Sequence, residues 1–130
     1  MLTSVLVIDD EATQTETIRL ILEPKDFEVW SAHGTNAGLE AVRRLNPDVV
    51  VLDLYTPGPD DWRVCRSIRE FSQVPILVLS ALNKPGWVAE ALDRGADSFL
   101  AKPVPGGVLA AHLKNLARRA RAERRAGAVG

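Results

Sequence analysis

Five short apolar runs alternate with segments of helical periodicity, and this alternation restricts the fold more than any other feature of the chain. The run at 48–54, DVVVLDL, is the most strand-like of them. A near-continuous apolar run of this length is typical of a parallel strand that helices cover on both faces. Alternating strands and helices predict βαβ units and therefore an α/β domain with a parallel sheet. The expected strands are 4–9, 27–32, 48–54, 75–81 and 98–102.

The segments between the runs carry apolar residues at helical spacing. Pro85 suits the first turn of the fourth expected helix, and Gly95 suits the position just after its end. The expected helices are 12–23, 35–45, 61–71, 85–94 and 105–125. The expected inner stripe of the last helix is Val108, Leu109, His112, Leu113 and Leu116.

Composition and charge exclude several classes of protein. A chain of 130 residues that is 46% hydrophobic corresponds to one domain with enough apolar side chains for a core. A net charge of −1 argues against a chain that as a whole binds nucleic acid or a membrane surface. No apolar run approaches the ~20 residues of a membrane helix. With no recognisable secretory leader and a single cysteine, Cys65, we expect a cytoplasmic location.

The last segment of the chain differs from the rest. Residues 117–126, ARRARAERRA, hold five arginines and one glutamate. We expect residues 1–118 to form the domain and 119–130 to be an arginine-rich tail that continues the last helix and then becomes disordered. Arginine suits the C-terminal end of a helix dipole. A linker to another module and a basic contact patch are the alternative interpretations of this tail.

Polar or charged side chains stand at the ends of four of the expected strands. Open parallel sheets bind ligands beyond the carboxyl ends of their strands, so we expect these side chains to converge at one edge of the sheet. They are Asp9, Asp10 and Glu11 after the first strand, Asp53 at the third, Ser80 at the fourth and Lys102 at the fifth.

The chemistry of these groups points to a metal and a phosphoryl group. The carboxylates of Asp9, Asp10 and Asp53 need a cation if they lie close together, and oxygen ligands suit Mg²⁺. The hydroxyl of Ser80 and the ammonium of Lys102 suit phosphoryl oxygens. A carboxylate between a metal and an ammonium can attack phosphorus as a nucleophile and become an aspartyl phosphate.

Four stretches occur in a specific order and spacing: VLVIDDE, VVVLDLYTPGPDDW, VPILVLSA and GADSFLAKPV. With them the chain resembles the receiver domain of two-component response regulators over about residues 3–118. The resemblance implies a single flavodoxin-like (βα)5 domain with strand order 2-1-3-4-5 and helices on both faces of the sheet.

The resemblance also implies roles for single residues. Asp53 would accept a phosphoryl group from a histidine kinase in a Mg²⁺-dependent reaction. Asp10 would bind the Mg²⁺ directly, and Asp9 mostly through water. The remaining implied roles fall on the Tyr55 backbone carbonyl as a metal ligand, Ser80 as the switch hydroxyl, Phe99 as the switch aromatic residue, and Lys102, aimed into the site by a cis peptide before Pro103.

The family resemblance further implies how such a domain signals. It would catalyse its own phosphorylation and dephosphorylation, and so it is not a conventional enzyme. Phosphorylation would draw Ser80 to the new oxygens, let Phe99 turn inward and reshape the face of the fourth helix, fifth strand and fifth helix. The expected partners of that face are a downstream protein, a fused output domain or a second copy of the chain, with no membrane. Nucleic acid would be bound only through an output domain.

Three residues depart from the family pattern or allow two interpretations. Asp61 stands eight residues after Asp53, where the family usually has glycine, and we interpret it as a helix cap. The ring of Tyr55 either slows attack by water on the phosphoryl group or lies on the surface. His33 is expected in a surface loop, without metal ligands beside it.

Other interpretations of the strand-end aspartate compete with the receiver. The chain could be the receiver fragment of a winged-helix DNA-binding transcriptional regulator. A haloacid dehalogenase-type phosphotransfer enzyme is less favoured, because that family needs an acid where Tyr55 stands. A flavodoxin-like cofactor carrier is disfavoured because the acidic DDEATQTE would repel a flavin phosphate. A receiver-like scaffold that no longer accepts phosphate is disfavoured because every chemical residue is present.

Overall fold

The computed structural model describes residues 2–9, 12–55, 57–82 and 84–129 of the chain. Within these residues, one five-stranded sheet has the order β2-β1-β3-β4-β5, and every pair of neighbouring strands is parallel. The order and the parallel pairing confirm the predicted (βα)5 arrangement. The strands are β1 (Thr3–Asp9), β2 (Phe27–His33), β3 (Val49–Leu54), β4 (Ile76–Ser80) and β5 (Ser98–Ala101).

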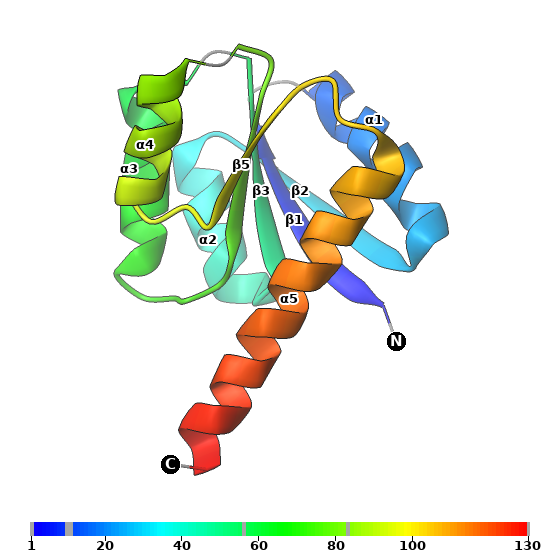
Figure 1. Ribbon diagram of the computed structural model, residues 1–130, viewed down its shortest axis with the longest axis vertical. Helices are drawn as coiled ribbons and strands as arrows, with labels where there is room; N and C mark the ends of the chain where they lie inside the picture. The colour runs from blue at the N-terminus through cyan, green and yellow to red at the C-terminus, as the bar shows by residue number, and fades with distance from the viewer. Residues whose placement is uncertain (1, 10–11, 56, 83, 130) are drawn as a thin grey trace.

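Helices cover both faces of the sheet, α1 and α5 on one face and α2, α3 and α4 on the other (Figure 1). A short 3-10 helix, η1 (Glu23–Lys25), follows α1. The helices are α1 (Ala12–Leu22), α2 (Thr35–Leu45), α3 (Pro59–Arg69), α4 (Pro85–Asp93) and α5 (Gly106–Val129). α3 begins two residues before its predicted start, because Pro59 fits a first helical turn, where no N–H donor is needed.

Alternate residues of the central strands pack into two separate hydrophobic clusters. Val5 and Val7 of β1 lie in the cluster under α1 and α5, whereas Leu6 and Ile8 lie in the cluster under α2, α3 and α4. All residues of β3 are buried. Burying each such side chain contributes about 1.5–3 kcal/mol, so the ends of β1 and β3 are held firmly in place. The polar residues that end these two strands are therefore positioned by the core.

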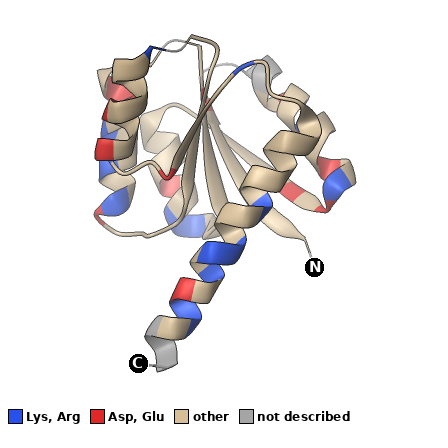
Figure 2. Cartoon of the chain, in the orientation of Figure 1, with Lys and Arg blue, Asp and Glu red and all other residues tan. Residues whose placement is uncertain are grey.

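The last helix is longer than the sequence predicted. α5 continues to Val129, past the expected end near Arg125, so the segment expected to become disordered is helical. Its alanines and arginines are among the strongest helix formers, which explains the extension. Arg121 also anchors the helix to the domain through an ion pair with Asp48 at 2.9 Å. The basic residues of this segment lie along the part of α5 that projects beyond the sheet (Figure 2).

The buried stripe of α5 differs in part from the prediction. Val108 is an exposed side chain, and His112 is also exposed. The helical spacing from the deeply buried positions leaves these two on the outer face. The buried stripe comprises Leu109, Ala110, Leu113, Leu116 and Ala117.

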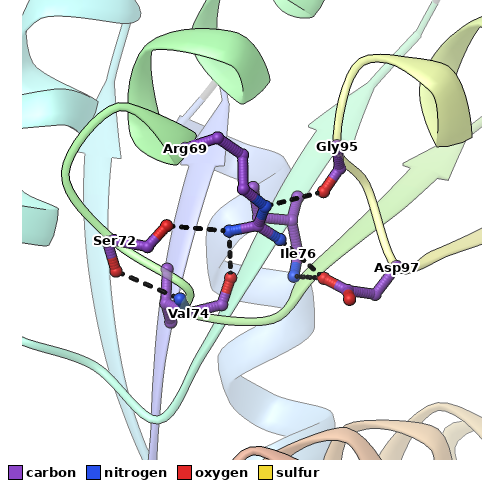
Figure 3. A network of polar contacts seen from close by, with 6 residues as sticks. All are labelled: Arg69, Ser72, Val74, Ile76, Gly95 and Asp97. Atoms are coloured by element: carbon purple, nitrogen blue, oxygen red, sulfur yellow. Dashed lines mark hydrogen bonds and ion pairs between the residues drawn. The ribbon is translucent and has the colours of Figure 1, made fainter.

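A single arginine joins the loops at the amino-terminal edge of the sheet. The Arg69 guanidinium donates to the carbonyl oxygens of Gly95 (3.0 Å) and Val74 (2.6 Å) and forms an ion pair with Asp97 at 2.7 Å. The same Asp97 oxygen accepts the backbone N–H of Ile76 at 2.8 Å. Gly95 has a φ of 111°, and a β-carbon there would lie 2.8 Å from Arg69 Cγ, so glycine is required. Figure 3 draws this network around Arg69, with Ser72 as a further member.

None of the helices in the described part of the chain combines the length and the hydropathy that a membrane span requires.

Candidate functional site

Two acids and a lysine from three strands meet at the carboxyl-terminal edge of the sheet. Asp9 ends β1, Asp53 lies one residue before the end of β3, and Lys102 follows β5. Lys102 Nζ forms an ion pair with Asp53 Oδ1. Asp9 lies near enough for its charge to act on the pKa of Asp53. Three of the residues predicted to converge are therefore brought together.

The Asp53 carboxyl group is the most unusual group of this edge. Only 3% of the residue is exposed, and neither oxygen accepts a hydrogen bond from the described residues other than through the ion pair with Lys102. Burial raises the pKa of Asp53 above its ordinary value, and the Asp9 charge raises it further, while Lys102 acts in the opposite direction. The net effect is upward, so the carboxylate is under-solvated and its oxygens are open to a cation or an electrophile.

Two side chains hold the Asp9 carboxylate. Thr15 Oγ1, from α1, donates a hydrogen bond to Asp9 Oδ2, and His33 Nδ1 lies 3.1 Å from Oδ1. The expectation that His33 lies in a surface loop was wrong, since it is the last residue of β2. It pairs with Asp9 in the parallel register of β1 and β2, which puts both side chains on one face. The expected second strand ended at residue 32, so aligning the ends of the two expected strands would have paired Asp9 with Ala32 and missed this contact.

Tyr55 and Ser80 are linked through the segment that follows β4. The Tyr55 carbonyl accepts the backbone N–H of Leu82 at 3.1 Å, and its second lone pair lies within reach of the Ser80 hydroxyl. Ser80 Oγ donates to the Leu82 carbonyl and lies 3.4 Å from the Tyr55 carbonyl. The side chain of Tyr55 is 66% exposed, which favours the surface interpretation of its ring.

Phe99 and Asp61 lie on the side of the sheet that α2, α3 and α4 cover. Phe99 is half-buried and packs against the cluster under these helices. Asp61 lies in the first turn of α3, and its Oδ2 accepts the N–H of Gly58 at 2.8 Å. The Asp61 N–H donates in turn to the Gly58 carbonyl at 3.0 Å. This reciprocal pair supports the interpretation of Asp61 as a helix cap.

Part of the predicted metal site lies outside the described residues. Asp10, the expected direct ligand of Mg²⁺, is one of the residues that the structure does not describe, and so are Glu11 and Thr56. Within the ranges that the structure describes, no three His, Cys, Asp or Glu side chains gather into a group that could hold a metal. The assignment of Mg²⁺ to Asp9, Asp10 and Asp53 therefore stays a prediction.

A cleft of about 300 Å³ leads to Asp53 from the side of α1 and α5. Its walls are mainly apolar, and the two charged groups lie together within it. The peptide between Lys102 and Pro103 is cis, as the resemblance implied. The lining residues are Thr17, Ile18, Ile21, Asp53, Leu79, Lys102, Pro103, Val104 and Leu109.

Comparison with known proteins gives one consistent result. The family model of the response regulator receiver domain matches residues 5–114. Among curated proteins, the chain is 38% identical over 120 residues to the transcriptional regulatory protein AfsQ1 of Streptomyces coelicolor, covering 92% of this chain and 53% of that protein. It is 36% identical over 118 residues to the KDP operon transcriptional regulatory protein KdpE of Escherichia coli, covering 91% and 52%. The chain thus spans about half the length of these relatives.

Solved structures agree with the sequence comparison. The BeF3-activated N-terminal receiver domain of Klebsiella pneumoniae RstA is 28% identical, with a TM-score of 0.82, covering 89% of this chain and 99% of that one. A two-component response regulator from Clostridium difficile is 26% identical, with a TM-score of 0.81, covering 90% and 97%.

Proposed function

The chain belongs to the response regulator receiver domain family, and from this premise we propose that it accepts a phosphoryl group on Asp53 from a phosphorylated histidine of a kinase. The observation that carries the proposal is the state of the Asp53 carboxylate. It is buried at the end of a central strand, its pKa is raised, and its one described charged partner is Lys102. Buried carboxyl groups with a raised pKa occur more often at functional sites than at purely structural positions.

The chemistry follows from the groups at this edge. A carboxylate oxygen of Asp53 attacks the phosphorus of the phosphohistidine, and the P–N bond breaks as the O–P bond forms. The histidine of the kinase leaves as the neutral imidazole once its nitrogen has taken up a proton. Lys102 neutralises negative charge on the transferring oxygens, for which its position beside Asp53 is suited. The cleft on the side of α1 and α5 gives the phosphodonor access to Asp53.

The residues present fit a bound Mg²⁺. The Asp53 oxygens accept no hydrogen bond from the described residues beyond the contact with Lys102, and Asp9 is held nearby. The Tyr55 carbonyl oxygen meets the Ser80 hydroxyl at 3.4 Å, a long contact that a metal ion can replace. This all-oxygen donor set, completed by Asp10, matches the preference of Mg²⁺. When bound, the ion would supply positive charge to the transferring oxygens, in addition to that of Lys102. The contacts from Thr15 and His33 fix the orientation of the Asp9 carboxylate toward it.

Ser80 and Phe99 carry the response to phosphorylation in this proposal. Ser80 Oγ exchanges its bond to the Leu82 carbonyl for one to a phosphoryl oxygen, since a charged acceptor forms the stronger hydrogen bond. The segment after β4 then loses the hydrogen bond between Ser80 and Leu82. Phe99 turns into the space that Ser80 leaves. The face formed by α4, β5 and α5 changes shape and meets its partner.

We further propose that this partner is a transcriptional output module. The relatives are named transcriptional regulatory proteins, and the chain spans about half their length. The alternative partners are a separate downstream protein and a second copy of the chain. The proposed location is the cytoplasm, where kinases of this kind deliver their phosphoryl group.

The proposal is tested by supplying the protein with acetyl phosphate and Mg²⁺ and measuring the mass of the intact chain. Wild type is expected to gain the mass of one phosphoryl group, and Asp53→Asn to gain none. Chelation of Mg²⁺ is expected to prevent the gain in wild type. A matched control is Asp26→Asn, because Asp26 is exposed and distant in sequence from the site and asparagine tolerates its left-handed backbone.

The outcomes discriminate between the candidates. Uptake in Asp53→Asn equal to that in wild type would exclude Asp53 as the acceptor. Hydrolysis of a phosphate monoester, such as p-nitrophenyl phosphate, over many turnovers would favour a haloacid dehalogenase-type enzyme instead. Size measurement of the same samples shows whether the phosphorylated form dimerises.

A further inference from the structure

A second cleft, of about 470 Å³, lies between α3 and α4, away from the cleft that reaches Asp53. The two helices pack side by side on the face opposite α1 and α5 (Figure 1). None of the residues assigned to the phosphorylation site lines this cleft. Its lining residues are Pro57, Gly58, Pro59, Trp62, Arg63, Arg66, Trp87, Glu90 and Arg94.

The lining of the cleft carries an excess of positive charge in a chain whose net charge is −1. Three arginines line it against a single acid, Glu90. Arg66 is exposed and has no acidic partner in the part of the chain that the structure describes.

The other two arginines are held only by weak partners. Arg63 pairs with Asp60 at 3.4 Å, and Arg94 pairs with Glu90 at 3.1 Å, each within its own helix. Such exposed pairs contribute little to stability, so an incoming carboxylate can replace the partner at small cost. All three guanidinium groups are therefore available to an anion, and their planar donor geometry suits carboxylates in particular.

Two tryptophans supply the apolar part of the cleft. Trp62 is nearly buried and Trp87 is half-buried, and both belong to the packing of the core under these helices. Lys84 Nζ lies 5.2 Å from the centre of the Trp87 ring, which adds a further positive charge at the edge of the cleft. Arginine and tryptophan are the residues most enriched among those that carry the binding energy of protein interfaces.

We propose that the cleft between α3 and α4 binds an acidic, glutamate- or aspartate-rich segment of a partner protein. The cleft follows α3 from Gly58 to Arg66, a length of about 12 Å, which an extended segment of about four residues spans. Charge complementarity selects an anionic occupant, and the length of the cleft along α3 selects an extended chain over a compact nucleotide. Pro57 to Pro59 connect the cleft to the end of β3, so its occupant lies next to the segment that follows Asp53.

The test is an NMR titration of the full chain with a hexaglutamate peptide at low ionic strength, without Mg²⁺ or phosphodonor. The backbone and indole resonances of Trp62, Arg66 and Trp87 are expected to shift. In the variant Arg63→Gln/Arg66→Gln the dissociation constant is expected to rise by about tenfold. The matched control is Arg118→Gln/Arg119→Gln, which removes two equally exposed helical arginines of α5 and is expected to leave the shifts around α3 and α4 unchanged.

Three results would overturn the proposal. Shifts confined to the arginine-rich end of α5 would show that the peptide binds there and not in the cleft. An equal loss of affinity in both double variants would show unspecific attraction to arginine. Adenosine monophosphate that shifts the same resonances when hexaglutamate does not would make the cleft a nucleotide site. None of these results depends on phosphorylation of Asp53, so failure here leaves the proposed function unaffected.

Discussion

The two edges of the one sheet use charged side chains in opposite ways. At the amino-terminal edge, Arg69 and Asp97 satisfy each other and the backbone groups around them. At the carboxyl-terminal edge, Asp53 is more deeply buried than either, yet its oxygens receive no hydrogen bond from the described residues beyond the contact with Lys102. The first edge is complete without a ligand, and the second is not.

This contrast separates polar groups that are satisfied within the fold from an acid that is left under-satisfied. Buried polar groups are almost always satisfied, so an unsatisfied one at the ligand-binding edge of a parallel sheet marks a functional site. The satisfied network at the other edge holds together the loops that precede β4 and β5. Both contain an acid and a base from different segments, so residue type alone does not separate them.

The largest effect is expected at the amino-terminal edge. Arg69→Ala leaves the carbonyls of Val74 and Gly95 and the Asp97 carboxylate without their donor. We expect the free energy of unfolding, measured by urea denaturation, to fall by about 3 kcal/mol. The exposed Arg66→Ala on the same helix is the control and should change it by less than about 0.5 kcal/mol. Loss of phosphate uptake in folded Arg69→Ala would contradict the separation of the two edges.

Removing the lysine tests the carboxyl-terminal edge. In Lys102→Met, Asp53 loses the cation that stands beside it, and the transferring oxygens lose a positive charge. The rate of phosphate uptake from acetyl phosphate is expected to fall by about 100-fold, by analogy with removal of one charge-stabilising donor. Lys25→Met, which removes an exposed lysine of η1 at the amino-terminal edge of the sheet, serves as the control. An unchanged rate in Lys102→Met would refute the role of this lysine.

Asp53→Asn is expected to stabilise the protein in the absence of metal. Replacing the under-solvated carboxylate with an uncharged amide should raise the free energy of unfolding at neutral pH by about 1–2 kcal/mol. The pKa of Asp53 is raised in the folded state, so as pH rises above 3.8 the unfolded chain loses this proton first. Wild type therefore loses stability relative to the variant between pH 3.8 and the raised pKa, and the difference is constant above it.

Denaturation of both proteins across this pH range measures the effect. A variant less stable than wild type at neutral pH would mean that the pair with Lys102 outweighs burial. Adding Mg²⁺ is expected to stabilise wild type more than Asp53→Asn, since a ligand stabilises the state that binds it.

The smallest effect is expected from the residue that holds Asp9. The side chain of His33 is 50% exposed, so its contact with Asp9 is partly replaced by water when it is removed. His33→Ala should therefore weaken Mg²⁺ binding by about threefold to tenfold, at or below the lower end of the effects that such supporting contacts have on metal affinity. Isothermal titration with Mg²⁺ measures the change. His112→Ala is the matched control, because His112 is exposed on α5. Equal affinities of the two variants would show that His33 does not position Asp9.

The (βα)5 fold and the convergence of charged residues at the carboxyl-terminal edge of its sheet could be predicted from the amino-acid sequence alone. Apolar runs and helical periodicity are local patterns, and the rule that ligands bind at the carboxyl ends of parallel strands is independent of the details of packing. The convergence of Asp53, Lys102 and Asp9 therefore follows from where each residue stands relative to the end of its strand.

Other contacts depend on register and on which helix faces which, and these emerge only from the packed molecule. The pairing of His33 with Asp9, the network around Arg69 and the basic cleft between α3 and α4 each join residues from different elements. The exposure of Val108 and His112 on α5 belongs to the same class. The local sequence pattern determines whether a segment is a strand or a helix. The packing of the elements against one another determines which partners and which charges surround each side chain.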